Sequence, residues 1–240
     1  MPARPSTAAI VRRICDHLKV NGSVEHAAGV QWFFKEEVRS HGWYTADLRR
    51  YGRELHRQLA DDQPVLLAVA EALFKRSYLE EKALSVVMLQ PSVRRFGAPE
   101  FERFEGWLDY VASWADHDAV AMYLLGPLMA ADPRRVKRVF AWARARDRWH
   151  RRAAAVAPIH GVRAGLFTAE AERVTRMLLA DRDDMVQKGL GWLLREWGKV
   201  RPAETIPLLM AVRADASRLV LRTACEKLAP ADRERILRRS

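Results

Sequence analysis

An aromatic residue and a carboxylate four positions apart, Trp114 and Asp118, are the first candidates for chemistry in this chain. On a helix this spacing places both side chains on one face. A carboxylate beside an aromatic wall can stabilise a cationic sugar while a glycosidic bond breaks, and it can orient the attacking water. We expect Asp118 to begin a helix at the surface of a groove. The alternative is that Asp118 or Asp116 only caps a helix and that Trp114 is a core residue.

Three arginines form a second cluster. Arg148, Arg151 and Arg152 lie beside Trp149 and precede an apolar run at residues 153–156. Arginines at a helix start that faces a groove can clamp backbone phosphates. The alternative is a basic helix face that only meets solvent.

A third cluster combines cations with a tryptophan over residues 187–199. Positions i, i+4, i+7 and i+11 of this segment share one helical stripe, and the apolar residues between them point the other way. A tryptophan in a cationic stripe can pack on a deoxyribose or a base. The alternative is that this tryptophan lies at an edge of the core. The stripe consists of Lys188, Trp192, Arg195 and Lys199.

The charge balance favours a polyanionic partner. The 240 residues contain 41 Lys and Arg against 30 Asp and Glu, a formal net charge of +11. Such a field attracts polyanions, chiefly nucleic acid. The alternative is an arginine-rich composition that reflects high-GC codons. Because 49% of the residues are hydrophobic, the chain can also bury a sizeable core.

Several classes of protein are not expected. The sequence has no apolar run long enough to span a membrane, and its first residues lead into a charged segment rather than a secretory signal. The chain has only two cysteines, Cys15 and Cys225, and so few thiols fit a reducing cytoplasm. No Cys/His cluster has the spacing of a zinc site. We therefore expect a cytoplasmic protein with no metal, no cofactor and no membrane partner.

The periodicity of apolar residues predicts helices throughout. Apolar positions recur at steps of three and four, and short breakers separate the helices, with N-caps expected at Asp62 and Asp132. No linker or low-complexity stretch divides the chain. The pattern favours one all-α domain over residues 1–240, an α-solenoid of HEAT-like helical repeats with a concave, basic DNA-binding face.

Together the three clusters resemble the AlkD family of bacterial DNA alkylpurine glycosylases, which fold as HEAT-like repeats. That family carries Trp-x-x-x-Asp, Trp-x-x-Arg-Ala-Ala and Gln-Lys-x-x-Gly-Trp-x-x-Arg-Glu, and residues 114–118, 149–154 and 187–196 match in order and spacing. The resemblance implies that Asp118 is the catalytic carboxylate and that Trp114 and Trp192 flank the deoxyribose of the lesion. It implies that Arg152 holds a phosphate nearby. Further DNA contacts are then expected from Arg148, Arg151, Lys188 and Arg195.

The chain departs from the family pattern at two places. Ala115 follows the first Trp where the family often has Asp, and the next two residues are Asp116 and His117. His117 either tunes Asp118 or faces solvent. In a turn near the N-terminus, Tyr44 stands where the family has Gln after Gly, so Tyr44 and the neighbouring Trp43 are candidate DNA contacts that would reshape the groove near the lesion.

The resemblance implies a monofunctional DNA glycosylase for cationic N3- or N7-alkylated purines in duplex DNA, acting in base excision repair. Such enzymes cleave without flipping the base, an exception to the usual extrusion. We expect a monomer in the cytoplasm at the nucleoid. Three alternatives stay open: a non-catalytic binder of distorted or branched DNA, a self-resistance glycosylase for bulky alkyl adducts, and a protein-interaction solenoid. The sequence leaves open whether a methyl or a bulky adduct is preferred.

Overall fold

The computed structural model describes residues 5–238, and helices account for most of this range. Within it no strand is present, and the one isolated bridge pairs Arg39 with Tyr78. The expected all-helical fold is therefore confirmed. The helices belong to two compact units, Met1–Leu124 and Leu125–Ser240. Among the described residues, no helix has both the length and the apolar character needed to cross a membrane.

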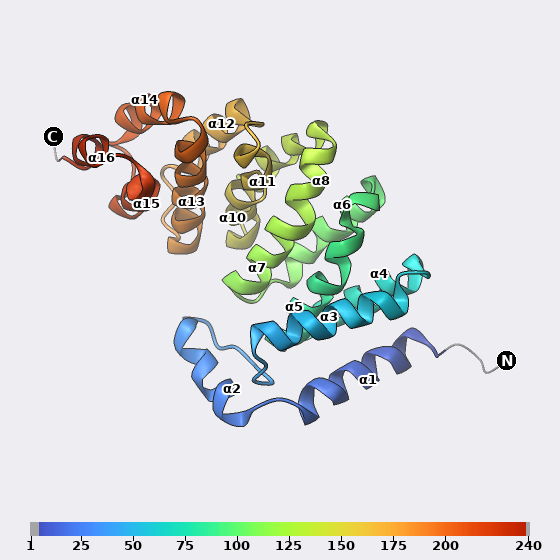
Figure 1. Ribbon diagram of the computed structural model, residues 1–240. Coiled ribbons are helices and arrows are strands. Elements are labelled where there is room, and N and C mark those ends of the chain that lie inside the picture. Colours follow the sequence, from blue (N-terminus) through green and yellow to red (C-terminus); the bar gives the residue numbers. More distant parts are fainter. Residues whose placement is uncertain (1–4, 239–240) are drawn as a thin grey trace. The chain divides into compact units, whose positions relative to one another are not determined.

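The first unit is built from stacked helices (Figure 1). α3 packs on α5, and α5 packs on α7, while α4 lies against α1 and α5. Packing of every second helix on the next is how the repeats of an α-solenoid stack. Its elements are α1 (Thr7–Val20), α2 (Val24–Val30), the 3₁₀ helix η1 (Gln31–Phe33), α3 (Thr45–Leu59), α4 (Gln63–Phe74), α5 (Leu79–Leu89), η2 (Gln90–Arg95), α6 (Ala98–Gly106), η3 (Trp107–Tyr110) and α7 (Trp114–Val120).

The core of the first unit is aromatic at its centre. Trp107 is fully buried, stacks on Phe74 with ring centroids 4.6 Å apart, and meets Phe104 edge-on at 5.1 Å. Asp62 caps α4 by accepting a hydrogen bond from the backbone N–H of Val65, as the sequence predicts. The rigid packing of α4 and α5 on this core supports α7, which carries the first cluster.

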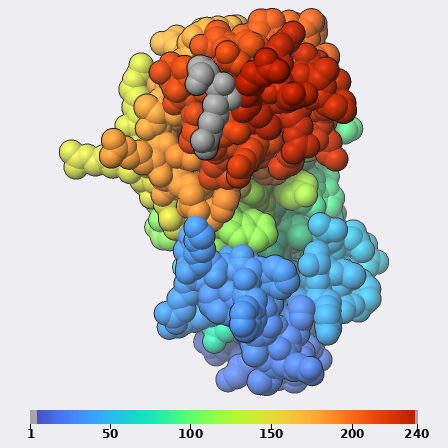
Figure 2. Space-filling view, turned by 90° about the vertical axis from the view of Figure 1, so that its left-hand side faces the viewer, coloured from blue at the N-terminus to red at the C-terminus, as the bar shows by residue number. Residues whose placement is uncertain are grey.

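α2 and η1 differ from the other described helices of the first unit in having no buried residue. In η1, Trp32 and Phe33 are 90% and 75% exposed. In Figure 2 the blue surface of residues 5–50, to which this segment belongs, is in view. A short helix without a buried face depends on its neighbours for its position.

The second unit repeats the stacking pattern. α10 packs on α13, and α13 packs on α15. The apolar side of α13 is buried at Leu190, Leu193, Leu194 and Trp197, as its periodicity predicts. A π-helical turn, η4 (Ala121–Leu125), ends at the first residue of this unit. The remaining elements are α8 (Gly126–Ala131), η5 (Pro133–Arg138), α9 (Val139–Trp142), α10 (Arg148–Val156), α11 (Ile159–Arg163), α12 (Thr168–Leu178), α13 (Asp184–Val200), α14 (Pro202–Val212), α15 (Arg218–Ala224), η6 (Cys225–Lys227) and α16 (Pro230–Leu237).

Candidate functional site

α7 begins earlier than the sequence suggests. Its N-cap is Ser113, whose backbone N–H and hydroxyl both donate to Oδ1 of Asp116, the N–H at 2.8 Å. The N–H of Ala112 donates to the other oxygen of Asp116, also at 2.8 Å. This is a capping box, so Asp116 is the carboxylate that starts the helix. The expectation that Asp118 begins a helix is wrong, because the cap lies upstream and leaves Asp118 in the middle of α7.

Trp114 is not a core residue. Its side chain is 37% exposed, and its ring stacks on Phe34 with centroids 5.2 Å apart and planes 18° apart. The indole N–H points to the backbone oxygen of Phe33 at 3.4 Å. The ring is thus held on one side by the segment that follows η1 while part of it remains accessible to solvent. An aromatic surface held in this way can contact a sugar or a base without first losing much conformational freedom.

His117 does not face solvent. Its side chain is fully buried, and its Nδ1 lies 2.7 Å from Oδ1 of Asp118. The Asp118 side chain is 19% exposed, so solvent reaches the carboxylate but not the imidazole. With the proton on Nδ1, the imidazole donates this hydrogen bond and fixes one oxygen of the carboxylate. The sequence left two roles for His117, and the burial removes the solvent-facing one.

A buried lysine lies beneath the start of α7. The ammonium group of Lys82, on α5, donates to the backbone oxygens of Phe74 at 2.7 Å and Tyr110 at 2.5 Å, and lies 3.8 Å from Oδ2 of Asp116. Burial lowers the pKa of Lys82 below its ordinary value, and the neighbouring Asp116 opposes this shift. Lys82 therefore joins the end of α4 to the capping box of α7.

A second buried charge of α5 holds the turn before α3. The carboxylate of Glu80 accepts hydrogen bonds from the Ser40 hydroxyl at 2.5 Å and from the backbone N–H groups of His41, Gly42 and Trp43 at 2.8, 3.0 and 3.3 Å. Gly42 has φ of +80°, which a side chain would disfavour. One carboxylate thus sets the path of the chain into Trp43.

The two aromatic residues of this turn differ in exposure. The indole N–H of Trp43 donates to the backbone oxygen of Leu18 at 2.8 Å, and its ring packs against Tyr51. Tyr44 is 60% exposed and stacks on His26 at 4.2 Å. Of the two predicted contacts at this turn, Tyr44 is therefore the more exposed, whereas Trp43 is half-buried and joins the turn to α1.

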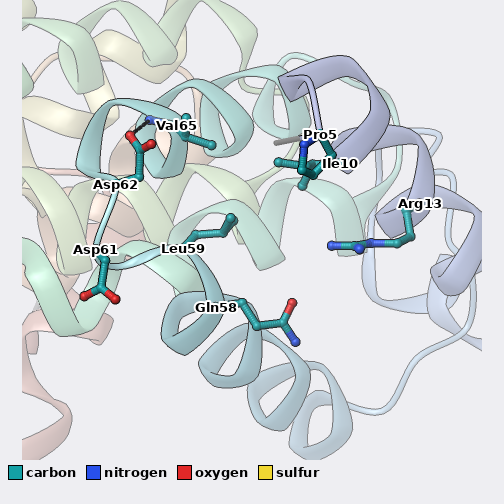
Figure 3. Close-up of a pocket in the computed structure, with 8 residues that line it drawn as sticks. All are labelled: Pro5, Ile10, Arg13, Gln58, Leu59, Asp61, Asp62 and Val65. Atoms are coloured by element: carbon teal, nitrogen blue, oxygen red, sulfur yellow. Dashed lines mark hydrogen bonds between the residues drawn. The ribbon is translucent and has the colours of Figure 1, made fainter. Parts of the chain in front are cut away.

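Of the two cavities of the first unit described here, one is lined in part by residues of α7 and the other is not. One of about 380 Å³ is lined by α1, the end of α3 and the start of α4; Figure 3 shows Asp61 and Asp62 in its wall, with Asp62 bonded to Val65. No candidate residue lines it. Another, of about 300 Å³, reaches α7 itself at Ala115 and Asp116. This second cavity is called the α7 cavity. Its polar lining residues are His26, Thr45, Glu80 and Asp116, and its aromatic and aliphatic ones are Val30, Phe33, Phe34, Trp43, Leu48, Leu79, Ala83 and Ala115.

The arginines of α10 are engaged within the second unit. Arg152 is only 5% exposed, and one of its guanidinium nitrogens donates to the backbone oxygen of Met185 at 2.5 Å. Arg151 forms an ion pair with Asp181 at 2.6 Å. The guanidinium of Arg148 lies over the ring of Trp149 at 4.5 Å and 3.7 Å from Asp183. The alternative of a basic face that only meets solvent therefore does not describe Arg151 or Arg152.

The stripe on α13 forms as predicted and is partly accessible. Lys188 pairs with Asp184 at 3.3 Å and is 43% exposed, and Arg195 pairs with Glu226 at 2.5 Å. Trp192 is half-buried, and its indole N–H is buried without a hydrogen-bond partner within residues 5–238. A buried indole N–H without a partner is uncommon. Trp192 therefore lies at the edge of the core, and part of the residue remains exposed.

The residues that sequence reasoning missed lie behind the candidates. Glu80 and Lys82 are buried, and both hold segments that carry predicted site residues. The signal available was the run Glu80-Glu81-Lys82 at the start of an otherwise apolar helix, because charged residues on a buried element need partners. No cluster of three or more potential metal ligands occurs in the part of the chain that the structure describes.

Two comparisons relate the chain to known proteins. The model of a family described as DNA alkylation repair enzyme matches residues 14–228. Among solved structures, a predicted DNA alkylation repair enzyme from Enterococcus faecalis has a similar fold, with a TM-score of 0.79 at 20% identity, over 87% of this chain and 97% of that one. The comparison with curated proteins found no match. Because the family model covers most of the residues, the chain belongs to the DNA alkylation repair enzyme family.

Proposed function

We propose that the protein is a monofunctional DNA glycosylase. It hydrolyses the N-glycosidic bond of cationic N3- or N7-alkylated purines in duplex DNA and leaves an abasic site for base excision repair. The observation that carries this proposal is the first cluster of α7. There, a carboxylate that solvent reaches, Asp118, is oriented by the buried His117, four residues from the partly exposed ring of Trp114.

The reaction does not need a general acid. An N3- or N7-alkylated purine carries a positive charge, so the electron pair of the breaking bond returns to the ring and the base leaves neutral. Water then forms the new bond to C1′ and gives up one proton. In this proposal the Asp118 carboxylate stabilises the positive charge that develops on the sugar and orients the water. Trp114 provides the wall against which the deoxyribose packs.

Leaving the base in the duplex is compatible with these residues. Asp118 and Trp114 act on the sugar, and the leaving base needs no proton from the protein, so no pocket around the purine is required. The proposed role of Asp118 also requires a fixed carboxylate. His117, which solvent cannot reach, acts on the substrate only through Asp118 and is therefore a positioning residue.

Several cations and aromatic residues supply proposed DNA contacts in each unit. Tyr44 in the first unit and Lys188 in the second are exposed enough to reach a phosphate or sugar directly. Arg195, Arg148 and Arg151 already pair with carboxylates, and those pairs would have to be shared or exchanged on binding. Trp192 is the proposed second contact to the deoxyribose. Arg152 would act on the phosphate with most of its side chain buried, and the protein would bind as a monomer.

The proposal is tested with duplex DNA methylated at random. Free 3-methyladenine and 7-methylguanine are separated by chromatography after incubation with the wild type, with Asp118→Asn and with Asp16→Asn. Asp16 is exposed on α1, so its variant makes the same change of charge away from the cluster. We expect release by the wild type and by Asp16→Asn, and a rate lower by about 10²–10³-fold for Asp118→Asn, the size of losing one electrostatic contact to a transition state.

DNA binding is measured on the same three proteins. We expect Asp118→Asn to bind the duplex as the wild type does, because its loss concerns the transition state. Excision by Asp118→Asn at the wild-type rate would remove Asp118 from the mechanism. DNA binding without release of any base by the wild type, from methylated or bulkier adducts, would leave the non-catalytic DNA binder as the better description.

A further inference from the structure

Two consecutive aromatic residues are left in solvent beside the proposed reacting residues. Trp32 and Phe33, both of η1, are 90% and 75% exposed. Trp32 makes no hydrogen bond and no ring contact with any other residue in the range 5–238. These two residues are called the η1 pair. Large apolar side chains that are exposed together mark a contact surface, whereas single ones scattered over a protein do not.

The η1 pair stands on a fixed support. The side-chain amide of Gln31 donates to the backbone oxygens of Phe34 at 3.3 Å and Glu36 at 2.8 Å, and its oxygen accepts from the backbone N–H of Val38 at 3.0 Å. The chain after η1 is therefore tied back to the start of η1, although neither α2 nor η1 has a buried residue. A contact surface held in this way loses little conformational freedom when it binds.

The support of the η1 pair is joined to α7. The backbone oxygen of Phe33 lies 3.4 Å from the indole nitrogen of Trp114, and the ring of Phe34 stacks on that indole at 5.2 Å. Phe33 and Phe34 also line the α7 cavity together with Ala115. A duplex whose deoxyribose packs on Trp114 therefore brings its neighbouring nucleotides to the η1 pair.

The charge around the η1 pair favours contact with bases over contact with phosphates. The cations and carboxylates of residues 24–39 are Lys35, Arg39, Glu25, Glu36 and Glu37. This segment thus has no excess of cations, although the whole chain has a net charge of +11. Attraction to the phosphate backbone must come from other parts of the chain. An apolar group presented to DNA without surplus cations is suited to insertion between base steps.

The proposed reaction requires access from the minor groove, because the glycosidic bonds of both strands lie on that side of the base pairs. In straight B-DNA this groove is about 6 Å wide. An α-helix with its side chains is about 10–12 Å across, so α7 is too wide to enter it. Apolar wedges from minor-groove proteins unstack a base step and kink the duplex toward the major groove, which opens the minor groove.

We propose that the η1 pair, and Trp32 above all, is a wedge that inserts between base pairs beside the lesion. The inference rests on the proposed glycosylase function and assigns it a residue that positions the substrate. Trp32 breaks the stacking on one side of the lesion while the damaged base stays in its pair. The opened minor groove then admits α7, and the carboxylate of Asp118 approaches C1′ of the lesion.

Bending of a duplex that cannot react tests the wedge. The duplex carries one 3-methyl-3-deazaadenine and a dye at each end, and energy transfer between the dyes is measured at saturating protein. We expect the wild type to raise the transfer, since wedges kink DNA by about 20–90°. Trp32→Ala should lose most of this rise and bind about tenfold more weakly, the size of one lost stacking contact. Its affinity should keep the wild-type dependence on salt, because no cation is removed.

Two matched variants accompany Trp32→Ala. Trp32→Phe keeps an aromatic ring and should retain most of the bend. Val24→Ala removes another exposed apolar side chain, 89% exposed on α2, and should bend the duplex as the wild type does. Thermal unfolding should be the same for all four proteins, because both positions are exposed. A wild type that leaves the duplex straight, or a bend that Trp32→Ala does not change, would overturn the proposal and point to a protein partner for the η1 pair.

The unreactive duplex also separates the wedge from the proposed function. A bend that Trp32→Ala abolishes would support the wedge even if the wild type released no base and the glycosylase function failed. Base release from randomly methylated DNA is measured on the same proteins under single-turnover conditions, and we expect Trp32→Ala to be slower by about tenfold or more. Equal release by the wild type and Trp32→Ala, without a difference in bend, would keep the glycosylase and reject the wedge.

Discussion

α7 of the first unit and α10 of the second begin alike and use their charged residues differently. Each has a Ser or Asp N-cap and a tryptophan in its first turn, followed within four residues by the charged group that the family pattern singles out. In α7 the tryptophan and Asp118 remain accessible, and the buried neighbours Asp116 and His117 make the structural contacts. In α10 the corresponding tryptophan and charged residue, Trp149 and Arg152, are themselves buried. Spacing identifies the cluster, whereas burial decides which of its members solvent and substrate can reach.

Removal of the buried cation beneath α7 should have the largest effect on stability. Lys82→Met takes away the donor to two backbone oxygens and the partner of Asp116, and we expect a loss of about 3–5 kcal/mol in the free energy of unfolding. Chemical denaturation measures it. The control is Lys75→Met, whose ammonium pairs with Glu71 at the surface and should contribute less than about 1 kcal/mol. Equal losses for the two variants would mean that Lys82 does not hold α7.

In the second unit, we expect Arg152 to contribute mainly to stability and Lys188 mainly to DNA binding. Arg152→Met should lower the free energy of unfolding by about 2 kcal/mol, since a buried charged hydrogen bond to Met185 is lost. Lys188→Met should change stability by less than about 1 kcal/mol and weaken binding to any duplex, with a shallower dependence on salt. If Arg152→Met is as stable as the wild type and only loses DNA affinity, the contrast drawn between α7 and α10 is mistaken.

The third prediction tests the orientation of Asp118. His117→Leu should slow base release by about tenfold to a hundredfold under single-turnover conditions, the equivalent of one hydrogen bond to a charged group. His117→Asn places an amide donor near the position of Nδ1 and should restore much of that rate. Both variants change a buried residue, so thermal unfolding is measured beside the kinetics. Similar rates for Leu and Asn at similar stability would show that the hydrogen bond is not what matters.

The smallest predicted effect is a pH dependence on α13. Burial alone would raise the pKa of Glu196, but hydrogen bonds from Lys199 and Arg163 outweigh it and hold that pKa below its ordinary value of 4.5. A carboxyl group with a lowered folded-state pKa stabilises the protein above the unfolded-state value, and the stabilisation is lost as the pH falls through the folded-state pKa.

Glu196→Gln is the test of that dependence. The wild type should be more stable than this variant by up to about 1 kcal/mol at pH 7, because Lys199 and Arg163 are partly exposed. The difference should shrink as the pH falls below about 4.5. Denaturation curves at several pH values measure it, and a difference that stays constant with pH would contradict the assignment.

Periodicity predicted the helices well, and local chemistry predicted some of their ends. Asp62 and Asp132 cap helices as expected, because capping depends on residues close in sequence. The start of α7 was misplaced because Ser113 and Asp116 form a capping box upstream of Asp118. The hydrogen bond from Arg152 to the backbone oxygen of Met185 joins residues more than 30 positions apart. So do the hydrogen bonds from the turn at residues 40–43 to Glu80. Such pairings depend on tertiary packing, which single-sequence patterns do not contain.

The central claim is that Asp118 performs the chemistry while cations such as Lys188 bind DNA. Its most direct test is to measure single-turnover excision at saturating protein, together with the duplex dissociation constant, for Asp118→Asn and Lys188→Ala. We predict that Asp118→Asn loses the rate and keeps the affinity, and that Lys188→Ala loses affinity and keeps the rate at saturation. Base release by Asp118→Asn at the wild-type rate would contradict the account.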